Sequence, residues 1–92
     1  MARSYYEEVR KRIEETPADM SRLLTYGEIV EQFGSRFDAL GLGRDEKAIR
    51  ATLRSMASRR ILRRYEVVGT VKIPANDIEI YLDVMSEPRL LV

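Results

Sequence analysis

The sequence predicts a small α+β domain in which three helices precede an antiparallel β-hairpin. Two observations support this prediction. Up to about residue 60 the apolar residues recur at the spacing of a helix face, and after it they alternate with a period of two, as in a strand with one buried face. A chain of 92 residues is long enough for one core, so we expect a single domain over residues 1–92.

The first helix is expected over residues 4–15, where apolar side chains recur at i, i+3 and i+7. Pro17 ends it, because proline pushes the residue before it out of the α region. The apolar run "RLL", residues 22–24, predicts a short isolated strand.

The second helix is expected over residues 26–38 and opens with a capping box. Thr25 can accept a hydrogen bond from the backbone N–H of Glu28, while the Glu28 side chain reaches back to the N–H of Thr25. The apolar residues that this helix turns inward are Ile29, Val30, Phe33 and Phe37.

The third helix, expected over residues 45–59, separates an apolar stripe from a basic face. Ile49, Leu53 and Met56 share the stripe that we expect to be buried. The opposite face alternates long cations with Ala and Ser. A helix in the DNA major groove needs this mixture, because guanidinium groups reach phosphates or guanine edges while small residues let the helix approach.

A hairpin is expected over residues 61–85. Its first strand, in "ILRRYEVV", is rich in β-formers, and "DIEIYLDV" alternates strictly, which places Tyr81 on the outward face of the second strand. The segment "GTVKIPAND" joins them as a long loop. The tail, residues 86–92, ends in the apolar "LLV", which fits either a dimer contact or closure of the core.

The charge is sorted along the chain. Residues 44–64 carry a formal charge of +6, and the other 71 residues carry −5. Acids that would pair the basic helix face at i, i+4 are missing after Glu46. A basic face is often no more than a solvated surface, but this pattern favours a surface that meets a polyanion.

Composition excludes much chemistry. The chain has no Cys and no His, which removes disulfides, thiolate metal sites, a cysteine nucleophile and the commonest general base. It has neither a signal-peptide pattern nor an apolar run long enough to span a membrane. We therefore expect a cytoplasmic, non-catalytic protein with no cofactor, no metal and no small-molecule substrate. Thirteen Arg against three Lys fit a thermophilic source or an Arg-rich coding bias equally well.

The order of the expected elements, with a basic third helix, resembles the winged helix-turn-helix superfamily over roughly residues 4–85. In that superfamily the third helix usually reads the major groove, and the hairpin, or wing, contacts adjacent phosphates or the minor groove. The resemblance implies contacts from the third helix by Arg44, Lys47, Arg50, Ala51, Arg54, Ser55, Ser58 and Arg59. It implies wing contacts by Arg63, Arg64 and Lys72, and Tyr26 is a further candidate.

The expected function is therefore sequence- or structure-dependent binding of double-stranded DNA by a nucleoid-associated transcriptional or replicon regulator, with a homodimer as a further expectation. The alternative is a winged helix used as a protein-protein interaction module, because an acidic protein also fits an Arg-rich face. Duplex binding with a steep salt dependence distinguishes the two.

A narrower likeness gives a third reading. "TYGEI", "RAT" and "VVG" look like pieces of the DNA-binding segment of the O6-alkylguanine alkyltransferases and alkyltransferase-like proteins. In that family a Tyr helps to extrude the damaged nucleotide and an Arg fills the gap, which implies Tyr26 and Arg50 here. The Pro-Cys-His-Arg motif is replaced by residues 63–66, "RRYE", so alkyl transfer is excluded and DNA damage recognition remains.

Overall fold

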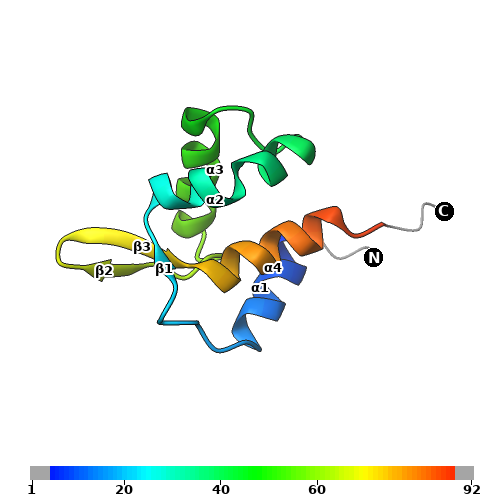
Figure 1. Cartoon of the computed structure of the whole chain (residues 1–92). Coiled ribbons are helices and arrows are strands. Elements are labelled where there is room, and N and C mark those ends of the chain that lie inside the picture. Colours follow the sequence, from blue (N-terminus) through cyan, green and yellow to red (C-terminus); the bar gives the residue numbers. More distant parts are fainter. Residues whose placement is uncertain (1–4, 89–92) are drawn as a thin grey trace.

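The structure, a computed structural model, describes residues 5–88. Within these residues the chain forms an α+β domain of four helices and a three-stranded antiparallel sheet (Figure 1). In chain order the elements are α1 (Tyr5–Glu14), β1 (Leu23–Leu24), α2 (Tyr26–Ala39), α3 (Glu46–Ser58), β2 (Tyr65–Val67), β3 (Thr70–Pro74) and α4 (Ala75–Ser86).

The sheet has β3 in the middle, with β1 on one side and β2 on the other. Leu24 is opposite Ile73 across the first pair, and Tyr65 is opposite Lys72 across the second. The pairing with β1 holds the inner end of β3 to the helices, while the outer part of the β2–β3 hairpin projects away from them (Figure 1).

The core lies between the helices. The stripe predicted for α3 is confirmed, since Ile49, Leu53 and Met56 are all buried. Helix α1 packs beside α4, and α2 packs beside α3 (Figure 1). The other buried apolar residues of the helices and strands include Val9, Ile13, Leu24, Ile29, Phe33, Phe37, Ile73, Ile78, Tyr81, Leu82 and Val84.

Side-chain caps begin α2 and α3. The predicted capping box is confirmed: the Glu28 N–H donates to Thr25 Oγ1 at 3.1 Å, and the Thr25 N–H donates to Glu28 Oε1 at 2.9 Å. Asp45 caps α3 by accepting from the Ala48 N–H at 2.8 Å. Each cap satisfies an N–H group that a helix start leaves without a partner, which is why the helices begin at these residues.

The second strand predicted for the hairpin is wrong, because the residues from Ala75 onward form α4. Their apolar positions fit both periods, and a helix places Ile78, Tyr81 and Leu82 together on one face. Tyr81, expected to face outward, is 1% exposed. Pro74 immediately precedes the helix, where its missing N–H leaves no helical bond unmade.

The hairpin is consequently shorter than expected. The long loop predicted over "GTVKIPAND" is wrong: a two-residue turn, Val68–Gly69, joins β2 to β3, and the rest of the segment is strand β3 and the start of α4. The apolar end "LLV" of the expected tail lies outside the described residues.

Candidate nucleic-acid interface

The face of α3 opposite the core is open. Lys47, Ala51, Arg54, Ser55 and Ser58 are all exposed, so the cations and small residues that the sequence placed on this face lie on one surface. This arrangement follows from the buried stripe: because Ile49, Leu53 and Met56 point into the core, the residues half a turn away must point outward.

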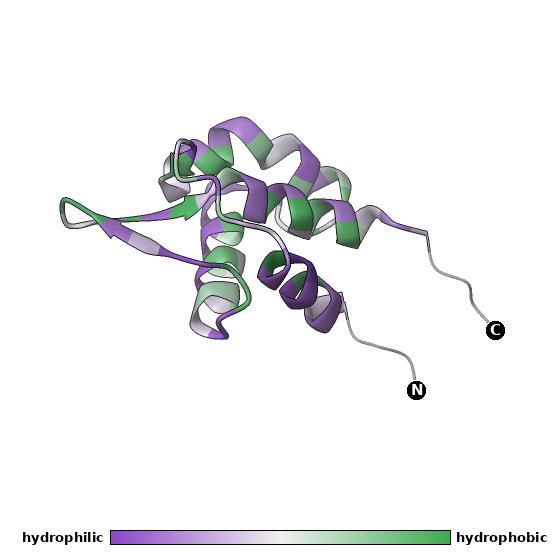
Figure 2. Ribbon diagram, turned by 90° about the horizontal axis from the view of Figure 1, so that it is seen from below, coloured by the Kyte–Doolittle hydropathy of each residue, from purple (hydrophilic) through white to green (hydrophobic). Residues whose placement is uncertain are grey.

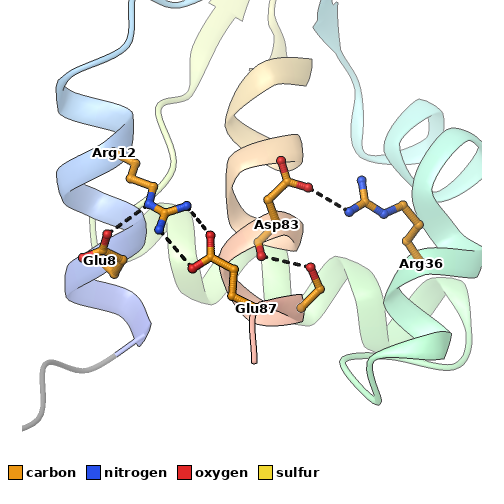
Figure 3. A network of polar contacts seen from close by, with 6 residues as sticks. Glu8, Arg12, Arg36, Asp83 and Glu87 are labelled. Atoms are coloured by element: carbon orange, nitrogen blue, oxygen red, sulfur yellow. Dashed lines mark hydrogen bonds and ion pairs between the residues drawn. The ribbon is translucent and has the colours of Figure 1, made fainter. Parts of the chain in front are cut away.

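Ion pairs hold many cations on the other elements. Arg12 of α1 donates to Glu8 at 3.0 Å and to both carboxylate oxygens of Glu87, and Arg36 of α2 pairs with Asp83 of α4 at 3.1 Å (Figure 3). Arg22 pairs with Glu79. These contacts tie α1 and α2 to α4, so the positive charge of these side chains is neutralised within the fold.

Most cations on and around α3 and the hairpin, by contrast, form no ion pair with another described residue. Among residues 5–88, the Lys and Arg side chains in no ion pair are Arg10, Lys11, Lys47, Arg54, Arg59, Arg60, Arg64 and Lys72. Six of these lie on α3, on the hairpin or between them. Uncompensated cations this close together repel one another, so the surface is electrostatically suited to an anion.

Arg50 and Arg44 are partly compensated. Arg50 donates to Glu46 Oε1 from Nε at 2.9 Å and from Nη2 at 2.7 Å. Arg44 lies 3.9 Å from Asp38 but is 91% exposed at its side chain. Both guanidinium groups still border the basic face, and Arg50, Lys47 and Arg54 line one shallow depression at the start of α3.

A cleft of about 410 Å³ separates the start of α2 from the hairpin turn. Tyr26 and Gly27 line one side, Arg50 reaches in from α3, and residues 69–71 line the other side. The Arg50 guanidinium packs close to this side, since a Cβ at Gly27 would be in van der Waals contact with Nη2, at 3.4 Å. The structure therefore brings together Tyr26 and Arg50, two residues that the sequence separates by a whole helix.

A second cleft, of about 460 Å³, lies where α3 meets the hairpin. Ser58, Arg60, Arg64 and Tyr65 are among its lining residues. Two of these side chains are cations without an ion pair in the described part of the chain. This cleft extends the basic surface from the end of α3 to the base of β2.

Sequence reasoning missed Arg60, whose position along the helix period falls on the buried stripe. The structure ends α3 with a Schellman motif, in which the Ile61 N–H donates to Met56 O at 2.9 Å and the Arg60 N–H donates to Ala57 O at 3.0 Å. Arg60 therefore has a left-handed backbone, with φ +58°, and its side chain is exposed. The usual signal for this motif is a glycine, and an arginine in its place conceals the end of the helix.

Arg63, expected among the wing contacts, is used inside the fold. Its backbone N–H and Nε donate to Asp77 Oδ2 at 3.0 and 3.1 Å, Nη2 donates to Asp77 Oδ1, and Nη1 donates to Thr16 O at 2.8 Å. The hydrogen bonds to Asp77 raise the pKa of the Arg63 guanidinium against the effect of burial. Arg64 and Lys72 remain as cations that the hairpin offers to a partner.

Helix α1 borders the far edge of the basic face. Tyr6 lines a depression of about 290 Å³ with Ala51 and Ser55, and the Arg59 guanidinium lies 5.8 Å from the centre of the Tyr6 ring. Arg10 donates to the Arg59 carbonyl at 3.0 Å. The first helix thus contacts the end of α3 and borders Ala51 and Ser55, which remain exposed.

Two other kinds of site are absent from residues 5–88. No group of three or more His, Cys, Asp or Glu side chains is arranged to hold a metal ion. No helix in this range is long and apolar enough to cross a membrane. Comparison with protein-family models, with curated proteins and with solved structures finds no match to the chain.

Proposed function

We propose that the chain is a winged helix-turn-helix protein that binds double-stranded DNA without catalysis, as a transcriptional or replicon regulator. Helix α3 lies in the major groove, the β2–β3 hairpin is the wing, and α4 is an additional helix packed against α1 and α2. The element order from α1 to β3 supports this assignment. The observation that carries the function is the outer face of α3, where exposed cations without ion pairs alternate with small residues.

The shape of this face suits a groove. Ala51, Ser55 and Ser58 form a low central strip along α3, and the longer Lys47 and Arg54 side chains stand beside it. Small side chains allow the helix axis to come close to the base edges, while the cations reach the phosphates of the two strands. On the hairpin, Arg64 and Lys72 reach the neighbouring phosphates.

Fluorescence anisotropy with a labelled duplex of random sequence, repeated at several salt concentrations, tests the proposal. Five of the six unpaired cations around α3 and the hairpin, all except Arg59, which lies over the Tyr6 ring, predict a slope of log K against log salt of about −4 to −5. Replacing Lys47 and Arg54 together by Ala lowers the magnitude of this slope by about two. Lys11→Ala is the control, because it removes an unpaired cation from α1 and leaves the slope unchanged.

Two outcomes would contradict parts of this proposal. Absence of binding to any duplex at low salt contradicts DNA binding itself; a slope that changes as much for Lys11→Ala as for a single cation of α3 contradicts the placement of the interface on α3. Tight binding to an acidic protein that duplex DNA does not displace would instead favour the protein-interaction module.

A second candidate within DNA binding is recognition of damaged DNA. The observation that favours it is the cleft that Tyr26 and Arg50 share, because a displaced nucleotide needs a recess and a side chain to replace it in the duplex. It predicts a preference for a duplex with an alkylated guanine over the same duplex undamaged. Tyr26→Phe and Arg50→Ala would remove this preference and leave binding to undamaged DNA measurable.

A further inference from the structure

The tip of the hairpin has an unfavourable backbone at its most exposed residue. Val68 and Gly69 form the two-residue turn, with φ +50° and +77°. Hairpin turns with positive φ at both central residues favour Asn-Gly, because a β-branched side chain is strained in that conformation. Val68 is nevertheless valine, and it is 99% exposed.

The fold does not explain this residue. A side chain that is 99% exposed buries no apolar area, and Asn or Gly would form the same turn with less strain. Strained backbone conformations cluster at functional sites, where the strain is part of how the site works. The exposed and strained Val68 is therefore a candidate for a contact outside the chain.

The tip is also uncharged, while the cations of the hairpin lie nearer its base. From Val67 to Val71 the segment carries no charged residue, and Figure 2 shows hydrophobic colour at the tip of the hairpin. Lys72 follows on β3, and Glu66, the nearest acid, is opposite Val71. Without a charge, the tip can offer a phosphate only the Thr70 hydroxyl and backbone N–H groups, whereas its apolar side chain can contact the stacked bases.

On the basis of the proposed DNA binding, we propose that the hairpin tip is an apolar wedge that enters the minor groove and deforms the duplex. Val68 presses on a base step, and Lys72 and Arg64 hold phosphates on either side of the groove. Inserting an apolar side chain partly unstacks a base step and bends the DNA. The protein then changes the path of the DNA as well as binding it.

A protein partner fits the tip less well. A stable protein interface buries about 800 Å² on each side, whereas the hairpin exposes only two large apolar side chains within the described residues, Val68 and the 37% exposed Val71. A groove between two phosphate strands suits a narrow tip with cations behind it. The unpaired cations of α3 also favour DNA over a protein partner.

Fluorescence energy transfer across a short duplex labelled at both ends tests the wedge. We expect the protein to raise the transfer efficiency at saturation, because bending brings the two ends together. Val68→Asn and Val68→Gly lose most of this rise and bind roughly tenfold more weakly, the size of one apolar side chain's contribution. Met20→Asn, which removes an exposed apolar side chain outside the hairpin, changes neither quantity.

Thermal unfolding separates this effect from damage to the fold. Val68→Asn relieves the strained turn, so its unfolding midpoint should rise, at about 4–8 °C per kcal/mol for a domain of this size. A variant that is more stable yet bends DNA less supports the wedge. If the parent binds DNA and Val68→Asn bends it equally, the wedge is wrong while DNA binding stands; if the parent binds no duplex in the anisotropy titration, the proposed function itself is wrong.

Discussion

The guanidinium of Arg63 spans both carboxylate oxygens of Asp77, a residue with no exposed surface. The same guanidinium reaches the carbonyl of Thr16, just beyond α1, so one side chain joins the start of the hairpin, the first turn of α4 and the end of α1. The most basic segment of the chain thus supplies a structural arginine as well as the exposed cations of the proposed DNA-binding surface.

Truncation of Arg63 should therefore lower stability, whereas truncation of its neighbour Arg64 should weaken DNA binding. Arg63→Ala leaves the buried Asp77 carboxylate without its cation and should lower the free energy of unfolding by about 3–5 kcal/mol. Arg64→Ala should leave stability nearly unchanged and lower the magnitude of the salt slope for DNA binding by about one. Urea unfolding and anisotropy titration of both variants check this. Equal loss of stability in the two variants would contradict the assignment.

Arg60 is expected to lower the stability of the fold and to strengthen DNA binding. Arg60→Gly removes the strain of a left-handed arginine and should raise the free energy of unfolding by about 1 kcal/mol. It should also weaken DNA binding and reduce the salt slope by about one, because a cation of the basic surface is lost. Arg60→Ala is the matched control: it loses the same cation but keeps the strained backbone, so binding should fall without the gain in stability.

Local sequence signals account for the parts of the fold that could be predicted. The capping box at Thr25, the apolar stripe of α3 and the order of the first five elements all depend on residues within one or two turns of each other. The segment of α4 gave a strict alternation instead, because a helix buried on most of its surface places apolar residues at almost any spacing. Periodicity cannot separate helix from strand in such a segment.

The site was predictable to a similar extent. Outward residues of α3 follow from its buried stripe, so Lys47, Ala51 and Arg54 are on the face where the sequence placed them. The role of Arg63 depends on Asp77, fourteen residues away, at the end of the segment predicted as a loop. The exposure of Arg60 depends on how one helix ends. The spacing of apolar residues does not show which distant residues form an ion pair, nor how a helix ends.

Stability at alkaline pH should depend on Tyr81. Burial, with a smaller effect of Tyr6, raises the pKa of the Tyr81 phenol from an ordinary value near 10 to about 12. The unfolded chain therefore loses this proton first, so the stabilisation is complete below about pH 10 and is lost as the pH rises towards 12. The unfolding midpoint of Tyr81→Phe should fall less between pH 10 and 12 than that of the parent. An identical decline in both proteins would show that Tyr81 ionises freely in the folded state.

The sharpest test of groove entry is Ala51, in the low central strip of α3. Ala51→Glu adds both volume and negative charge where the base edges are expected, so duplex binding should weaken by more than tenfold at constant salt, a loss above about 1.4 kcal/mol. Because Ala51 is exposed, the unfolding midpoint should change little. Ala39→Glu places the same substitution at an exposed position of α2 and should leave most of the affinity intact, while Ala51→Gln separates the effect of volume from that of charge. If Ala51→Glu binds as well as Ala39→Glu, α3 does not enter the groove, and an acidic protein becomes the better partner for its cations.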